Sequence, residues 1–215
     1  MSPAVSAGRG FDLLAARRSL ARRDARLAVA MRRIGPIDVG ARWDEPFDTV
    51  DVLARSILHQ QLSGKAAATI IARVEAAVAA DCLSADGLRR VDDHALRACG
   101  VSAAKARALR DLCARREAGQ VPDADRLAHM DSDSIVEQLS AVRGIGRWTV
   151  EMLLIFRLGR PDVLPLDDLG IRRGAQWLDG LDAAPSRRAL AERGSAWAPW
   201  RSLAALYLWR IADGG

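Results

Sequence analysis

The spacing of apolar residues constrains this 215-residue chain more than any other feature of its sequence. Between glycine and proline breakers, almost every segment repeats its apolar positions at helical spacing, and β-branched runs of strand length are missing. The sequence therefore predicts an all-α fold, in which Ser102 and Ser132 have the residue type that caps helix N-termini. We expect helices near residues 11–34, 46–60, 63–79, 84–99 (with a break), 102–117, 123–130, 132–142, 147–158, 168–178, 186–193 and 199–211.

Two long irregular segments indicate how these helices divide into lobes. Residues 35–45 and 159–166 lack helical patterning and are the places where the chain is expected to cross between lobes. We expect an N-terminal part, residues 1–45, that packs with a C-terminal lobe, residues 151–215, and a separate central lobe, residues 46–150. An active-site cleft is expected between the two lobes.

The charge balance favours a polyanionic partner. Lys and Arg total 32 against 27 Asp and Glu, which gives a net charge of +5 and suits a partner such as nucleic acid. Only Lys65 and Lys105 are lysines, and alanine is abundant, so a GC-rich coding bias explains much of the arginine content equally well.

The cysteines and the hydropathy pattern indicate a soluble protein of the cytosol. Cys82, Cys99 and Cys113 are widely spaced and form neither a disulfide framework nor a CxxC metal motif, so free thiols in a reducing compartment are expected. No apolar run approaches about 18 residues, and the N-terminus lacks the order of a secretory signal. The histidines, at 59, 94 and 129, show no metal-ligand spacing, so no metal site is expected.

The segment "VRGIGRWTV" at residues 142–150 predicts a tight hairpin between two helices. Gly144 and Gly146 permit positive φ angles and a close approach of a ligand to the backbone, while the second helix directs its first N–H groups and positive dipole end outward. Arg147 and Thr149 beside the glycines favour a phosphate site over the alternative, a helix C-cap followed by a simple turn.

Two adjacent carboxylates, Asp167 and Asp168, precede the next predicted helix. The nine residues from 159 to 167 reach at most about 30 Å, enough to return toward the hairpin. A structural explanation is that one aspartate is an N-cap and the other an acid in the first turn of the helix. We expect such a structural role for one of the two. The second carboxylate is then available for chemistry.

The residues from this hairpin to the Asp pair resemble the helix-hairpin-helix DNA glycosylases, and most closely their alkylbase branch, the 3-methyladenine DNA glycosylase II enzymes. Three further motifs resemble that family in the same order, so the resemblance covers about residues 20–211. They are "SILHQQLSGKAA" at 56–67, "LRACGVSAAKARALRDL" at 96–112 and "WAPWRSLAALYLWR" at 197–210.

The resemblance implies a role for the second carboxylate and for the aromatic residues. Asp168 matches the catalytic carboxylate, which leaves Asp167 as the helix cap. Trp148 and Trp209 match the walls of the base pocket, whereas Met152 stands where well-known members carry an aromatic residue.

It also implies two DNA contacts. The hairpin matches the segment that holds a DNA phosphate, and the turn at 60–62 matches the segment that plugs the duplex. The plug is usually apolar in this family, but an ungapped match places Gln61 at that position with Leu62 next to it. Either Gln61 or Leu62 is therefore expected to insert. The implied phosphate residues are Arg143, Gly144, Gly146, Arg147 and Thr149, and the implied wedge residues are Gln60, Gln61 and Leu62.

These matches imply a monofunctional DNA glycosylase that flips and excises alkylated purines from damaged double-stranded DNA. Bifunctional relatives carry a lysine where Trp148 stands, so no AP-lyase activity is expected, and the four-cysteine iron-sulfur motif of endonuclease III relatives is absent. We expect a monomer of the cytoplasm and nucleoid without a cofactor, apart from room for a structural monovalent cation at the hairpin. The alternatives are a glycosylase for deaminated or other damaged bases and a non-enzymatic DNA-binding hairpin module.

Overall fold

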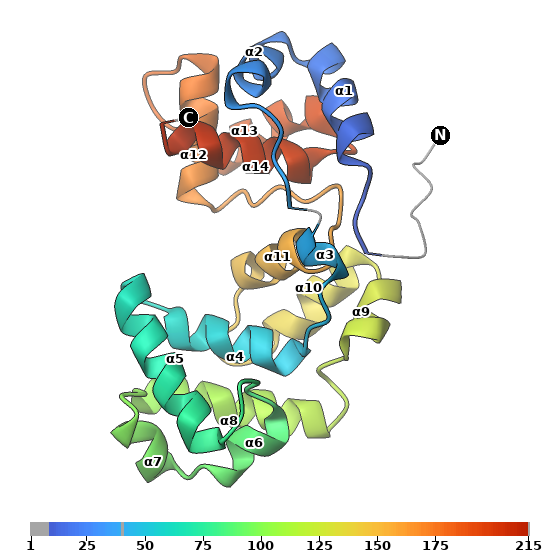
Figure 1. Cartoon of the computed structure of the whole chain (residues 1–215). Helices are drawn as coiled ribbons and strands as arrows, with labels where there is room; N and C mark the ends of the chain where they lie inside the picture. The colour runs from blue at the N-terminus through green and yellow to red at the C-terminus, as the bar shows by residue number, and fades with distance from the viewer. Residues whose placement is uncertain (1–8, 40, 215) are drawn as a thin grey trace. The chain divides into compact units, whose positions relative to one another are not determined.

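The computed structural model describes residues 9–39 and 41–214, and over these ranges it contains helices and no β-strand (Figure 1). The all-α prediction is confirmed. Contacts between Cα atoms divide the chain into two compact units, which we call the terminal unit, residues 1–45 with 151–215, and the central unit, residues 46–150. The boundary falls inside helix α11, Arg147–Phe156. None of the described helices has the length and apolarity needed to span a membrane.

The terminal unit is organised around its last helix. Helix α14 packs most extensively on α12, which crosses it in Figure 1, and also contacts α1 and α2. Residues 202–208 of α14 are all buried, so this helix forms the core of the unit. Besides the C-terminal part of α11, the helices of the unit are α1 Leu13–Arg23, α2 Ala25–Ile34, α3 Ala41–Asp44, α12 Leu169–Asp179, α13 Arg187–Gly194, the short 3-10 helix η1 Ser195–Trp197 and α14 Arg201–Ala212.

The central unit is organised around α8, which packs on α4, α6 and α7. Leu109 and Leu112 of α8 and Leu53 of α4 are all fully buried in this core. The helices of this unit are α4 Thr49–His59, α5 Gly64–Val78, α6 Ala85–Arg90, α7 Asp93–Ala98, α8 Ala103–Glu117, α9 Ala124–His129 and α10 Ser132–Ser140, together with the start of α11.

Side-chain caps fix where most of these helices begin. Ser102 caps α8 as predicted, because its hydroxyl accepts the N–H of Lys105. Two predicted caps are wrong by one residue: Asp131 rather than Ser132 caps α10, and Asp168 rather than Asp167 caps α12. In both cases the neighbouring carboxylate accepts the N–H three residues later, which is the geometry that defines the cap.

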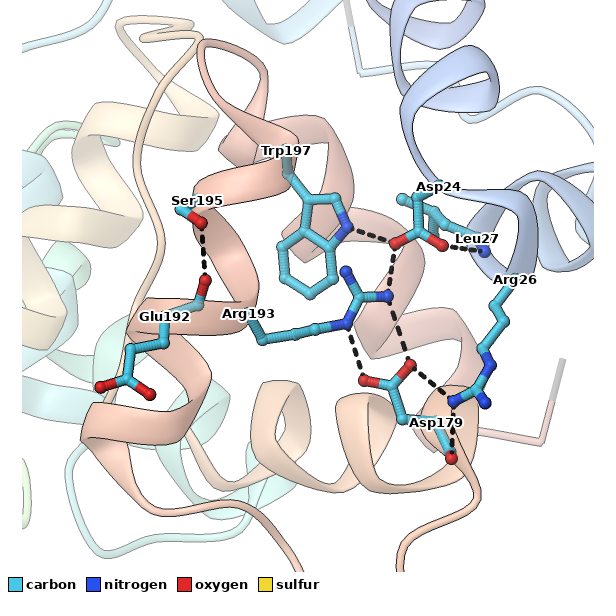
Figure 2. Close-up of polar contacts among 8 residues, drawn as sticks. All are labelled: Asp24, Arg26, Leu27, Asp179, Glu192, Arg193, Ser195 and Trp197. Atoms are coloured by element: carbon cyan, nitrogen blue, oxygen red, sulfur yellow. Dashed lines mark hydrogen bonds and ion pairs between the residues drawn. The ribbon is translucent and has the colours of Figure 1, made fainter.

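The predicted helix at 11–34 is interrupted by Asp24, whose extended backbone (φ −141°, ψ 102°) ends α1 and starts α2. The buried Asp24 carboxylate accepts the N–H of Leu27 at 3.0 Å and the indole N–H of Trp197 at 2.7 Å, and pairs with the guanidinium of Arg193 (Figure 2). Arg193 also pairs with Asp179 of α12. One ion network thus joins α1, α2, α12, α13 and η1.

Two opposing effects act on the pKa of Asp24. Burial raises it, but the hydrogen bonds from Leu27, Trp197 and Arg193 outweigh burial, so the pKa lies below its ordinary value of 3.8. Asp24 therefore stabilises the fold above about pH 4, and that contribution disappears as the pH falls through the lowered pKa.

We predict that Asp24→Asn lowers the free energy of unfolding by about 3 kcal/mol at pH 7. This is the low end of the range for breaking a buried ion pair, because Arg193 retains its ion pair with Asp179. Urea titrations of both proteins measure this difference, which should shrink as the pH is lowered below about 4. Glu192→Gln is the matched control. It removes an exposed pair with Arg188 and should change stability by less than about 0.5 kcal/mol. Equal stability of Asp24→Asn and wild type at pH 7 would contradict the assignment.

Candidate active site

The carboxylate of Asp168 is held by two N–H donors on a single oxygen. Its Oδ1 accepts the backbone N–H of Ile171 at 2.8 Å and the indole N–H of Trp209 at 2.9 Å. The first bond caps α12 and the second reaches across to α14, so the orientation of the carboxylate is fixed from two helices. Asp167, by contrast, is exposed and pairs with Arg187 at 3.0 Å. Asp168 thus takes both the capping role that was predicted for Asp167 and the central position of the candidate site.

Two glycines of α12 permit this contact between the helices. A Cβ atom at Gly170 would lie 2.9 Å from Cδ1 of Trp209 and 3.1 Å from Oδ1 of Asp168. At Gly174 it would lie 2.0 Å from the backbone oxygen of Leu208, a separation that no packed side chain tolerates. Both positions therefore require glycine for α12 and α14 to approach closely enough for the Asp168–Trp209 bond.

Trp209 also borders an aromatic pocket of the terminal unit. Its ring stacks on Phe156 with centroids 5.7 Å apart and an interplanar angle of 21°. Both rings line a pocket of about 310 Å³, within the range of about 300–1,000 Å³ for small-molecule sites. The remaining lining residues are Ile37, Asp38, Val39, Arg42, Leu206, Arg210 and Asp213.

The predicted phosphate-binding hairpin is present in the central unit, where it connects α10 to α11. Gly144 has a φ of +79°, which favours glycine, and a Cβ there would also lie 3.3 Å from Ala108 of α8. The buried side chain of Ile145 anchors the turn in the core. The backbone N–H of Arg143 donates to Asp111 of α8 at 2.7 Å. The turn is therefore rigidly attached to α8.

Most of the predicted phosphate residues are accessible. Arg143, Gly144, Gly146 and Arg147 are exposed, so the hairpin presents backbone and guanidinium groups to solvent. Thr149 is only 9% exposed, so its hydroxyl offers little surface to a ligand.

The two predicted pocket residues on α11 differ in exposure. Trp148 is 48% exposed, an unusual state for a large aromatic residue, while Met152 is partly buried. The indole of Trp148 is therefore accessible from solvent.

The turn between α4 and α5 carries the three predicted wedge residues. The amide of Gln60 donates to the backbone oxygen of Gly144 at 2.6 Å, so its side chain ties this turn to the hairpin. Gln61 adopts the left-handed conformation with a φ of +57°, and Leu62 is 39% exposed. The amine of Lys105, whose pKa is lowered by burial, donates to the backbone oxygen of Leu58 at the end of α4. The turn is thus held on both sides.

Several of these contacts have no signal in the sequence. Phe156, Asp213 and the wall at residues 37–39 were not predicted as site residues, and neither was the bond from Gln60 to Gly144. Helical spacing offers one partial signal, because Phe156 follows Met152 by four positions on α11. Among the described residues, no cluster of three or more His, Cys, Asp or Glu side chains is arranged to hold a metal ion.

Comparisons with known proteins identify the family of this chain. The family model described as HhH-GPD superfamily base excision DNA repair protein matches residues 54–199. DNA-3-methyladenine glycosylase 1 of Schizosaccharomyces pombe is 36% identical over 175 residues, which cover 78% of this chain and 73% of that protein. The crystal structure of a DNA-3-methyladenine glycosidase from Bacillus halodurans is similar with a TM-score of 0.83 at 37% identity, covering 92% of this chain and 88% of that one. A 3-methyladenine DNA glycosylase of S. pombe in complex with abasic DNA is similar with a TM-score of 0.75 at 32% identity, covering 91% of this chain and 95% of that one.

We predict that Gly174→Ala destabilises the protein by about 1–3 kcal/mol, because the added methyl group forces α12 and α14 apart. Thermal unfolding measures the loss. Gly64→Ala is the control: Gly64 is the first residue of α5, and an added Cβ meets nothing within 4 Å. That change should leave stability the same or slightly higher. Similar unfolding temperatures for the two variants would show that the helices do not need the glycine.

Proposed function

Because this chain belongs to the HhH-GPD superfamily of base excision DNA repair proteins, we propose that it is a DNA glycosylase that excises alkylated purines of the 3-methyladenine class from double-stranded DNA. The observation that carries the proposal is the Asp168 carboxylate, oriented by Ile171 and by Trp209, which also borders the aromatic pocket. A catalytic carboxylate and a stacking surface for a base are the two parts that such a reaction needs.

The hairpin and the turn beside it are suited to hold DNA while a nucleotide leaves the helix. Exposed backbone at Gly144 and Gly146 and the first turn of α11 are proposed to bind a backbone phosphate. Extruding a nucleotide costs a few kcal/mol, and a side chain inserted into the gap offsets part of that cost. We assign the insertion to Leu62, an exposed apolar residue, while Gln60 holds the turn against the hairpin.

The aromatic residues are suited to the extruded base. We propose that an alkylated purine stacks on Trp209 beside Phe156. We also propose Trp148, whose indole is exposed, as a base-contacting residue. An N3- or N7-alkylated purine is cationic, so an aromatic face adds roughly 0.5–2 kcal/mol of cation–π attraction over an uncharged base. Selection of the damaged base thus begins with its charge.

The chemistry is hydrolysis of the N-glycosidic bond. As that bond breaks, its electron pair moves to the purine and cancels the positive charge of the alkylated ring, so the leaving group needs little acid assistance. The sugar becomes oxocarbenium-like, and the Asp168 carboxylate stabilises its positive charge in a preorganised site. Water then adds to C1′ and passes a proton to the carboxylate, which leaves free base and abasic DNA.

We further propose that the enzyme does not cut the abasic strand. Strand cleavage by bifunctional relatives needs an amine that forms a Schiff base with the sugar, and Trp148 stands at that position here. Of the two lysines in the chain, Lys105 donates its amine to a helix carbonyl. We propose that the protein acts as a monomer and without a cofactor.

Asp168→Asn is expected to abolish measurable release of 3-methyladenine from methylated duplex DNA while DNA affinity is kept or increased, because a negative charge near the phosphates is removed. Base release is measured by chromatography, and strand integrity by denaturing gel before and after alkali. Asp167→Asn is the matched control and should retain near wild-type activity, because Asp167 pairs only with the exposed Arg187 among the described residues.

The outcomes separate the candidate functions. Full base release by Asp168→Asn would overturn the catalytic assignment, and strand breaks before alkali would overturn the monofunctional one. If the wild type releases no alkylated base, a panel of deaminated and oxidised lesions tests the same-fold alternative. Binding without release from any lesion would indicate a non-enzymatic module.

The wedge assignment is tested by Leu62→Ala. We expect it to lower the single-turnover excision rate at least tenfold, a cost of about 1.4 kcal/mol in the barrier. Gln61→Ala, one residue away in the same exposed turn, should have the smaller effect. A larger loss in Gln61→Ala would move the insertion to that residue.

A further inference from the structure

The positive charge of this chain is concentrated in one pair of helices. Residues 11–34, which contain α1 and α2, carry seven arginines and two aspartates, so their net charge of +5 equals that of the whole chain. The rest of the sequence is electrically balanced. The proposed phosphate hairpin lies in the balanced remainder, so the net positive charge that favours a polyanion comes from α1 and α2.

The two aspartates of this segment do not neutralise its surface. Asp12 and Asp24 are both N-caps, which accept the N–H groups of Ala15 and Leu27. Asp24 is buried and already paired with Arg193. Neither aspartate forms an ion pair with an arginine of α1 or α2 among the described residues, and six of the seven arginines are exposed.

Three of these arginines make no hydrogen bond or ion pair among the described residues. Arg17 donates to the backbone oxygen of Met31, and Arg26 pairs with Asp179, so both contribute to packing. Arg18, Arg22 and Arg32 are exposed, and within residues 9–39 and 41–214 no hydrogen bond or ion pair engages their guanidinium groups.

Helix dipoles account for only part of this pattern. Arg22 and Arg32 lie in the last turns of α1 and α2, where a cation is favoured by about 0.3–1 kcal/mol. One cation per helix end would satisfy that preference, yet each last turn carries two arginines, and Arg18 lies outside both turns. The groove between the helices has Arg18 and Arg32 on its walls, together with Arg17.

We propose that the α1–α2 surface around Arg18, Arg22 and Arg32 is a second DNA contact, which binds backbone phosphates independently of any lesion. This inference rests on the proposed function, because it assumes that duplex DNA is the polyanion. Guanidinium groups bind phosphate oxygens in a bidentate manner, and contacts of this kind supply affinity for undamaged DNA during the search for a lesion. They lie apart in sequence from the hairpin, the wedge turn and Asp168.

The test compares two triple variants with the same net charge. Arg18→Gln, Arg22→Gln and Arg32→Gln together remove three charges from α1–α2. Arg73→Gln, Arg90→Gln and Arg97→Gln remove three exposed charges from the central unit. Fluorescence anisotropy with an undamaged 30-base-pair duplex gives the dissociation constant between 50 and 200 mM NaCl, and thermal unfolding verifies that both variants are folded.

We expect the slope of log K against log salt to fall in magnitude by up to about 2.7 in the α1–α2 variant, since each phosphate contact contributes about 0.9. The loss of affinity across this salt range should then be up to roughly 40-fold smaller than in wild type. The central variant should keep the wild-type slope. Single-turnover excision at saturating enzyme should be unchanged in both variants.

Equal slopes in the two variants would overturn the inference, since net charge alone would then explain the binding. A wild-type slope in the α1–α2 variant would overturn it as well and would point to an acidic protein partner for these arginines. Failure of the proposed function is a different result: the wild type would then release no base from methylated DNA, whatever its salt dependence.

Discussion

The hydrogen bonds at one oxygen of Asp168 are the interaction on which the site depends. A carboxylate at a helix N-terminus normally serves the first turn alone, but here the same oxygen also accepts the indole N–H of Trp209. The cap fixes the carboxylate relative to α12, and the indole fixes it relative to α14. The helix start, the packing of α12 on α14 and the proposed catalytic geometry are consequently a single arrangement, with little freedom to vary one part separately.

The sequence predicted the local features of this arrangement well. Helical periodicity and breakers were sufficient for the all-α fold, and the spacing of Gly144 and Gly146 located the hairpin. The prediction of which aspartate of the pair caps α12 was wrong. Adjacent aspartates are equally good cap types, and only the backbone path into α12 decides which side chain reaches the N–H three residues on. The predicted cap at Ser132 was wrong for the same reason, because the neighbouring Asp131 caps α10.

The remaining features could not be predicted because their partners are distant along the chain. Asp24 falls inside the single helix predicted at 11–34, and nothing nearby in the sequence indicates that Arg193 and Trp197 complete its environment. Nothing in the sequence around Gln60 indicates that its side chain donates a hydrogen bond to the backbone oxygen of Gly144. These contacts are set by tertiary packing, which periodicity does not report.

One wall of the aromatic pocket has a different character from the others. Phe156 and Trp209 stand on packed helices, but residues 37–39 belong to a stretch without regular structure, tied to α14 where the Tyr207 hydroxyl donates to the backbone oxygen of Gly35 at 2.9 Å. Insertions and deletions are tolerated in such stretches and not in helical cores. If the damaged base occupies this pocket as proposed, new base preferences are most easily acquired by changing the length of this wall, while the helices that carry the carboxylate stay as they are.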